Sequence, residues 1–193
     1  MKCNICSSRR LILASGSPRR QELLARMGYS FESCSPEVDE QASGCADQVV
    51  SILAERKARA VVPKYQDAVI IASDTLVSLD GKPLGKPSDR EDAKKMLTAL
   101  SGRSHEVFSG VCIIDALSGK MQKQVVCTGV TFRKLDPDEI DKYIETGEPM
   151  DKAGAYAIQG GARDFVERLE GSFENVMGFP VKEVKEMLKA MGL

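Results

Sequence analysis

The sequence predicts an α/β fold built on a mixed, partly antiparallel sheet with flanking helices. Short apolar runs of strand length alternate with segments of helical period. Two long strand-like segments, 105–115 and 124–135, are joined only around Ser118-Gly119, which makes them antiparallel neighbours. The strict strand–helix alternation of a doubly wound parallel sheet is missing. Because the 193 residues contain no repeat or linker, we expect one domain spanning 1–193.

The first strand is expected at the apolar run 11–14, and it leads directly into a helix. Ser17 is expected at the N-cap and Pro18 at the first helical position. Arg19 and Arg20 follow in the first turn and precede the apolar stripe of the helix, so both are expected to point inward. Free backbone N–H groups, the positive end of a helix and two guanidinium groups together favour an anionic ligand.

The middle of the chain places two charged residues in apolar surroundings. Helical periodicity covers 46–62, and Lys57 falls on the apolar stripe, where an unpaired ammonium group is costly. An apolar strand follows at 68–72 and is expected to break at Ser73-Asp74-Thr75, before a hairpin that turns at Asp80-Gly81. Asp74 would then stand at the end of a strand, where catalytic groups commonly emerge in α/β folds.

The second half of the chain is expected to hold three further helices. Ser88 and Glu91 are expected to form a capping box at the start of the first. Asp136 would cap the second, and Pro180 would begin the third. A glycine-rich stretch at 151–161 separates the last two helices.

Composition excludes several classes of protein. Hydrophobic residues make up 42% of the chain and charged residues 28%, which is ordinary for a globular protein. The net charge of −1 and the absence of tryptophan argue against a nucleic acid polymer as partner. No apolar run is long enough to span a membrane, and the N-terminus does not have the pattern of a signal peptide, so we expect a cytoplasmic protein.

Six cysteines are expected to be free thiols, because nothing in the sequence indicates secretion. Cys3 and Cys6 form a C-x-x-C pair. A structural zinc site needs two more ligands, and His105 is the only histidine, so zinc is not expected.

A set of charged residues suits a polyphosphate bound with a divalent metal. The cations of this set are Arg19, Arg20, Lys57 and Lys86, the last held between two prolines in GKPLGKP. Glu40 and Asp74 would supply hard oxygen ligands to the metal. The phosphate-binding signatures G-x-x-x-x-G-K-[ST] and G-x-G-x-x-G are absent, and the presence of a single histidine argues against a Ser-His-Asp triad.

Each of these residues also has a purely structural interpretation. The arginines could be solvated, Lys57 could extend from the edge of its stripe, Asp74 could cap a loop, and Lys86 could be a surface charge. Only the whole set, in a chain of almost no net charge, points to phosphate.

Several motifs in order resemble the Maf family of nucleoside triphosphate pyrophosphatases over nearly the whole chain from Leu11 onward. The motifs are LASGSPRRQELL, AERKARA, ASDTLV, GKPLGKP, LSGRSHEVFSGV and DKAGAYAIQG. The resemblance implies a fold related to inosine triphosphate pyrophosphatases, with two lobes around a deep cleft. It also implies hydrolysis of nucleoside triphosphates to monophosphate and pyrophosphate with Mg²⁺ or Mn²⁺, by attack of a metal-activated water on the α-phosphorus. A homodimer is typical of the family.

Site residues are carried over from the family by position. Asp74 corresponds to the proton acceptor. Substrate binding is assigned to Ser15, Ser17, Arg19, Arg20, Lys57 and Lys86, and metal binding to Glu40 and Asp74. DKAGAYAIQG and GSFENVMGFP look like the branch that prefers dTTP and UTP, in which Arg19, Thr75 and Gln159 bear on specificity. A glutamine amide offers the donor and the acceptor that the imide edge of thymine or uracil requires.

Two other functions stay open at this point. One is the removal of methylated or abnormal nucleotides such as 7-methyl-GTP, against which Gln159 argues. The other is a nucleotide-binding regulator of cell division, since Maf proteins are also linked to septum formation. Ala157 and Phe173 depart from the residues more usual in the family, glycine and tyrosine, and bear on base preference rather than on chemistry.

Overall fold

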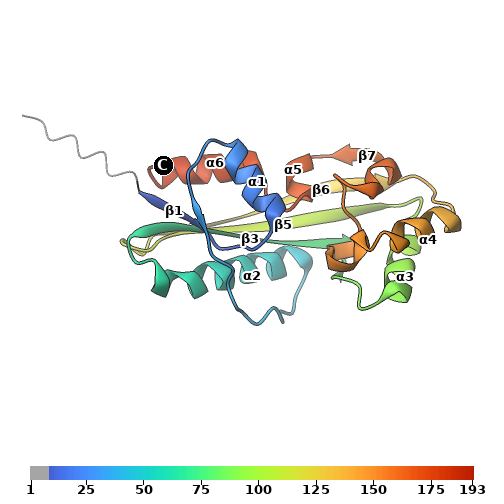
Figure 1. Cartoon of the computed structure of the whole chain (residues 1–193), viewed down its shortest axis with the longest axis horizontal. Helices are drawn as coiled ribbons and strands as arrows, with labels where there is room; N and C mark the ends of the chain where they lie inside the picture. The colour runs from blue at the N-terminus through green and yellow to red at the C-terminus, as the bar shows by residue number, and fades with distance from the viewer. Residues whose placement is uncertain (1–8) are drawn as a thin grey trace, which may run out of the picture.

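The computed structural model describes residues 9–193 and is built around one seven-stranded mixed sheet (Figure 1). The strand order is β2-β1-β3-β5-β6-β7, with β4 paired to β3. The strands are β1 (Arg10–Leu13), β2 (Glu32–Ser33), β3 (Ala68–Leu79), β4 (Lys82–Leu84), β5 (Ser104–Asp115), β6 (Met121–Phe132) and β7 (Val166–Glu170). β1 runs parallel to β2 and β3, and the other pairings are antiparallel, which confirms the predicted mixed sheet. The C-x-x-C of Cys3 and Cys6 lies outside the described residues.

Helices cover both faces of the sheet (Figure 1). The α-helices are α1 (Pro18–Arg26), α2 (Ala46–Val61), α3 (Arg90–Leu100), α4 (Pro137–Glu145), α5 (Phe173–Val176) and α6 (Val181–Ala190). The short 3₁₀ turns are η1 (Val62–Lys64), η2 (Glu148–Asp151), η3 (Ala153–Ala155) and η4 (Gly161–Phe165). α2 covers one face, and α1 and α6 cover the other (Figure 1). Within residues 9–193, no helix combines the length and the apolar character needed to cross a membrane.

The alternation of side chains along β3 decides which helix each residue meets. Val69 and Ile71 pack under α1 and α6, in one core cluster. Ile70 and Ala72 point the other way and pack against α2. The same alternation continues along the strand. It directs the side chain of Asp74 toward α2 and those of Ser73 and Thr75 toward α1.

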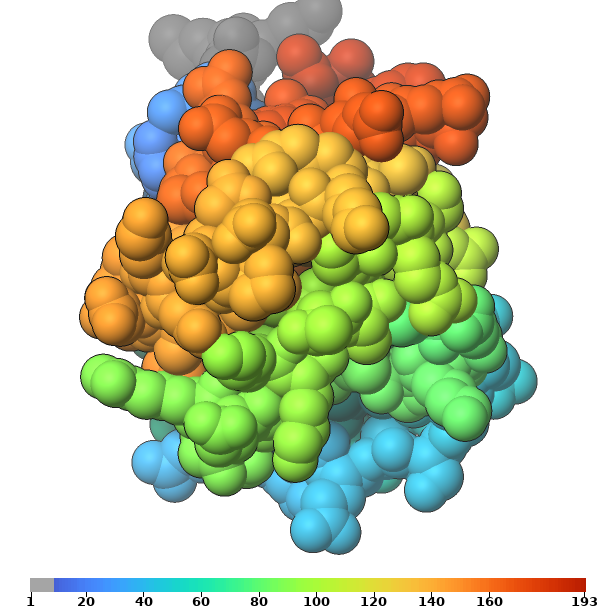
Figure 2. Space-filling model, turned by 90° about the vertical axis from the view of Figure 1, so that its right-hand side faces the viewer, coloured from blue at the N-terminus to red at the C-terminus, as the bar shows by residue number. Residues whose placement is uncertain are grey.

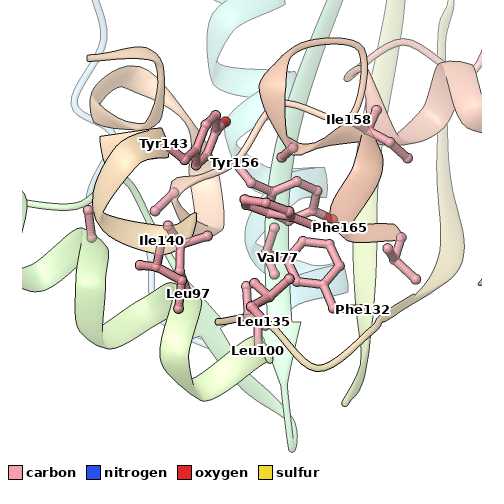
Figure 3. Close-up of a cluster of buried hydrophobic side chains, with 14 of the residues drawn as sticks. Val77, Leu97, Leu100, Phe132, Leu135, Ile140, Tyr143, Tyr156, Ile158 and Phe165 are labelled. Atoms are coloured by element: carbon pink, nitrogen blue, oxygen red, sulfur yellow. The ribbon is translucent and has the colours of Figure 1, made fainter. Parts of the chain in front are cut away.

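A third core fills the end of the molecule that carries α3 and α4, which lie against each other there (Figure 2). Its centre is aromatic: Phe132 meets Tyr156 and Phe165 edge to face, with ring centroids 4.9 and 6.0 Å apart (Figure 3). Leu97 and Ile140 close it from α3 and α4. β3, β5 and β6 each contain 12 residues, and β3 and β5 contribute side chains to this core as well as to the first two.

Two local predictions were wrong. β3 does not end before Ser73 but continues to Leu79, because its hydrogen-bonded partner β5 runs beside it over this whole length. α3 is capped by Asp89 and not by Ser88: the Asp89 carboxylate accepts the N–H of Asp92 at 2.8 Å. The predicted hairpin turn at Asp80-Gly81 and the predicted cap of α4 by Asp136 are both confirmed.

α2 lies close to the sheet because of one glycine. Gly110 of β5 faces the helix, and a Cβ at this position would lie 2.5 Å from the carbonyl carbon of Val50. Gly110 is also the register partner of Asp74. The residue that allows the close approach of α2 therefore sits beside the predicted catalytic carboxylate.

Candidate active site

The sheet has a gap on one side of β3. β1 ends at Leu13, and β4 begins to pair only at Val77, so that residues 72–76 have a neighbouring strand only in β5. A cleft of about 810 Å³ opens at this gap, a size typical of small-molecule sites. All ten residues predicted for the site line it: Ser15, Ser17, Arg19, Arg20, Glu40, Lys57, Asp74, Thr75, Lys86 and Gln159.

An ion-paired group of three residues forms the centre of the cleft. Lys57 reaches from α2 between two carboxylates, with Nζ 2.6 Å from Asp74 Oδ1 and 2.7 Å from Glu40 Oε1. The side chains of Lys57 and Asp74 are only 12% and 11% exposed, whereas that of Glu40 is 57% exposed. The hydrogen bond from Lys57 lowers the pKa of Glu40, with Lys86 and Arg20 adding to the effect. Lys57 is therefore neither unpaired nor simply extended to solvent.

Arg20 is a half-buried cation of the site. Its Nε donates to the carbonyl of Gly178 at 3.0 Å and its Nη2 to Thr75 Oγ1 at 3.3 Å. Burial lowers the pKa of its guanidinium group, and the charge of Asp74 opposes that effect. The prediction that Arg20 points inward is confirmed.

Arg19 faces the other side of the cleft, toward the segment that follows α4. There Lys152 pairs with Asp151 and lowers its pKa, and the charge of Arg19 contributes to the same shift. The two arginines of the first turn thus diverge, Arg20 to Thr75 and Gly178 and Arg19 to the glycine-rich segment.

The loop before α1 is ordered by its own amides. The N–H of Ser15 donates to Leu13 O at 2.9 Å, and that of Ser17 donates to Ser15 Oγ at 3.1 Å. Ser17 occupies the N-cap position, but its hydroxyl makes no capping hydrogen bond. The first-turn amides of Arg19 and Arg20 are therefore left without a side-chain cap and can meet an anion.

The glycine-rich segment is braced by residues that no sequence motif indicated. Tyr143 accepts the N–H of Ala157 at 3.0 Å, and Glu148 accepts the N–H of Gly161 at 2.9 Å, one on each side of Gln159. Burial raises the pKa of Tyr143, and the charge of the neighbouring Glu148 adds to the effect. Lys152, which lines the cleft, is another residue missed, and its place within the motif DKAGAYAIQG was the available signal.

The carboxylates of the cleft fit a divalent cation that also binds phosphate. Glu40 and Asp74 converge on one ammonium group, which shows that the two can serve the same cation. In the part of the chain that the structure describes, no cluster of three or more His, Cys, Asp or Glu residues could hold a metal by itself. Magnesium is commonly held by one or two carboxylates together with substrate phosphates, and this donor set matches that pattern.

Comparison with known proteins agrees with this site. The family model described as Maf-like protein matches residues 10–191. The dTTP/UTP pyrophosphatase of Pelotomaculum thermopropionicum is 47% identical over 184 residues, covering 94% of this chain and 96% of the relative. Those of Desulforamulus reducens and Clostridium botulinum strain Okra are 46% and 48% identical, covering 96% and 95% of this chain and 98% and 97% of the relatives.

The fold has a counterpart among solved structures. A HAM1 protein from Coxiella burnetii superposes with a TM-score of 0.53 at 15% identity, over 94% of this chain and 99% of that protein. This likeness concerns the fold alone. Since the family model spans nearly the entire chain and the relatives align over nearly their full lengths, the chain belongs to the Maf family.

Proposed function

We propose that the protein hydrolyses nucleoside triphosphates, preferring dTTP and UTP, to the nucleoside monophosphate and pyrophosphate. The observation that carries the proposal is the ion-paired group of Asp74, Lys57 and Glu40 at the gap in the sheet, faced by three further cations. The names of the relatives support the same activity. Nucleoside triphosphates are made and used in the cytoplasm, and we assign the activity there.

Asp74 is the residue assigned to proton transfer. Lys57 binds its Oδ1 and fixes the carboxylate, while its Oδ2 has no donor among the described residues and can accept the proton of the attacking water. Arg19, Arg20, Lys57 and Lys86 would bind the triphosphate and stabilise the charge that develops as pyrophosphate leaves. Glu40 and Asp74 would hold Mg²⁺ or Mn²⁺, which when bound supplies charge neutralisation and a more acidic water.

Gln159 is assigned to recognition of the base. It lines the cleft, on the segment that Tyr143 and Glu148 hold by hydrogen bonds. Its amide can pair with the imide N–H and a carbonyl of thymine or uracil, whereas cytosine presents a different donor and acceptor pattern. The expected homodimer belongs to this proposal and is checked by light scattering.

The test is pyrophosphate release from dTTP, UTP, CTP, dATP, dGTP, ITP and 7-methyl-GTP, each with Mg²⁺ and with Mn²⁺. We expect dTTP and UTP to be preferred, with monophosphate as the second product. Preference for 7-methyl-GTP would keep the chemistry and contradict the role of Gln159. Binding without any release would leave a nucleotide-binding protein instead of an enzyme.

The variant Asp74→Asn tests the assignment of Asp74 as the proton acceptor. This variant keeps the size of the side chain and should still bind nucleotide, but turnover should fall by roughly a hundredfold or more because the proton acceptor is lost. Asp80→Asn is the matched control: Asp80 lies in the exposed hairpin turn at a φ of +52°, which asparagine tolerates well. Turnover of Asp74→Asn close to that of the control would contradict the assignment of the proton acceptor.

A further inference from the structure

A buried chain of polar groups continues from the cleft into the sheet, and the mechanism above does not use it. Thr75 Oγ1, which accepts from Arg20, lies 2.8 Å from Ser109 Oγ of β5. Ser109 Oγ in turn donates to the main-chain carbonyl of Asn175, in α5, over 2.9 Å. Ser109 and Asn175 are completely buried, so that water does not compete for the hydrogen bond between them.

The direction of each hydrogen bond follows from the protons available. A guanidinium group only donates and a carbonyl only accepts. Ser109 has a single hydroxyl proton and gives it to Asn175, so its oxygen accepts from Thr75. The proton of Thr75 is therefore committed to Ser109, and its oxygen accepts from Arg20. It follows that Thr75 has no proton left to donate to a bound nucleotide.

A second route connects Ser109 with Arg20. The carbonyl of Asn175 also accepts the N–H of Gly178 at 2.9 Å, and the carbonyl of Gly178 accepts Arg20 Nε at 3.0 Å. Gly178 has a φ of +101°, and a Cβ there would lie 3.1 Å from Thr75 Oγ1. Both of these routes to the guanidinium group begin at the hydroxyl of Ser109, and the carbonyl of Gly178 is held in addition by Ser73 Oγ, which donates to it at 3.0 Å.

Arg20 depends on these neutral acceptors for its orientation. No carboxylate in residues 9–193 lies within ion-pair distance of it, and its third acceptor, Ser15 Oγ, is 3.5 Å away, at the limit of a hydrogen bond. Gly178 and Thr75 thus fix the plane of the guanidinium group, and its remaining N–H groups are those that can bind phosphate.

We propose that Ser109 is a positioning residue for triphosphate binding, which orients Thr75 and Asn175 so that Arg20 presents its free N–H groups to phosphate. Thr75 then acts on the substrate through Arg20 and not as a donor to it. This inference rests on the proposed function, because that function makes phosphate the ligand of Arg20.

The first measurement is calorimetric binding of inorganic pyrophosphate, together with KM for dTTP. Ser109→Ala should weaken pyrophosphate binding and raise KM by roughly tenfold, since a charge-assisted contact loses its orientation. Ser104→Ala is the matched control, because Ser104 lies on the same strand but is exposed, and its hydroxyl bonds that of Thr131. Unchanged affinity in Ser109→Ala would overturn the proposal.

A double-mutant cycle with Arg20→Lys separates positioning from a general loss of packing. An ammonium group lacks the planar fork that Gly178 and Thr75 orient, so Ser109→Ala should change pyrophosphate affinity less than about twofold in the lysine background. An equal loss in both backgrounds would show a merely structural role and refute the proposal.

Two variants of Thr75 test the proposal even if Ser109→Ala does not fold. Thr75→Ser retains the hydroxyl and should bind pyrophosphate like the wild type, whereas Thr75→Val should lose about as much affinity as Ser109→Ala. Weak binding by Thr75→Ser would count against the proposal. Because pyrophosphate binding needs no turnover, an inactive wild-type protein would refute the proposed function while leaving this test intact.

Discussion

His105 makes the stability of this protein depend on pH in a defined window. Its ring is buried between Phe132 and Tyr156, with Nε2 2.8 Å from the hydroxyl of Tyr156 and no partner at Nδ1 among the described residues. Burial lowers the pKa of His105 from 6.5 to about 4. The unfolded chain therefore binds one more proton than the folded protein between these values, and the free energy of unfolding falls as the pH falls through them.

The size of the effect follows from the same two pKa values. Between pH 7.5 and pH 5 an unfolded histidine becomes almost fully protonated, while His105 in the folded protein stays neutral. The free energy of unfolding should drop by about 2 kcal/mol over this range from His105 alone, and by about 3 kcal/mol once the pH is below both values. For a chain of this length, 2 kcal/mol corresponds to roughly 4–8 °C in Tm.

The assay is urea unfolding at both pH values for the wild type and for His105→Gln, which cannot be protonated and still offers a partner to Tyr156. Carboxylates contribute equally to both proteins, so the difference between their pH dependences isolates the histidine. His105 is the only histidine in the chain, and its ring resonance can be followed directly by NMR. A resonance that titrates near pH 6.5, or equal pH dependences of the two proteins, would refute the reasoning.

Three further predictions concern the cleft and its support. Gly110→Ala should destabilise the fold by about 1–3 kcal/mol in thermal unfolding and reduce turnover, because the new Cβ pushes α2 and its Lys57 away from β5. Gly129→Ala is the control: the nearest atom to its new Cβ would be 3.6 Å away, so this variant should unfold like the wild type. Lys57→Gln should move the acidic limb of the pH–rate profile to higher pH, since Lys57 lowers the pKa of Glu40, and an unmoved limb would contradict this ion pair. Tyr143→Phe leaves the N–H of Ala157 without its acceptor, so the ratio of kcat/KM for dTTP over dCTP should fall several-fold with little change in turnover of dTTP.

The sequence was sufficient for elements whose signals are local. The hairpin at Asp80-Gly81 follows from the preference of such dipeptides for left-handed backbone, and the start of α4 from Asp136 and Pro137. The position of the cap of α3 was missed because Ser88 and Asp89 are both good N-caps. In the structure Asp89 takes the cap, while Ser88 donates to the carboxylate of Asp92 from one residue further out.

The membership of the cleft was predicted by resemblance and by charge, but its internal contacts were not. Asp74 was expected at the end of a strand because Ser-Asp-Thr interrupts an apolar run. Polar residues can continue a strand, however, where a neighbouring strand ends and a cleft takes its place. Ser109 and Glu148 carry no local signal, since their roles arise from residues more than ten positions away.

The long strands of the sheet also determine how the cleft can respond mechanically to its ligand. β3 and β5 extend from the cores on one side of the cleft into the core on the other, so that the two sides share continuous strands. Any change in the width of the cleft must therefore be absorbed as twist or bend of continuous strands, with a restoring force set by their hydrogen bonds. Closure of the cleft should therefore be a small elastic bending of the sheet and not a rotation about a hinge, and its extent should increase with the binding free energy of the ligand.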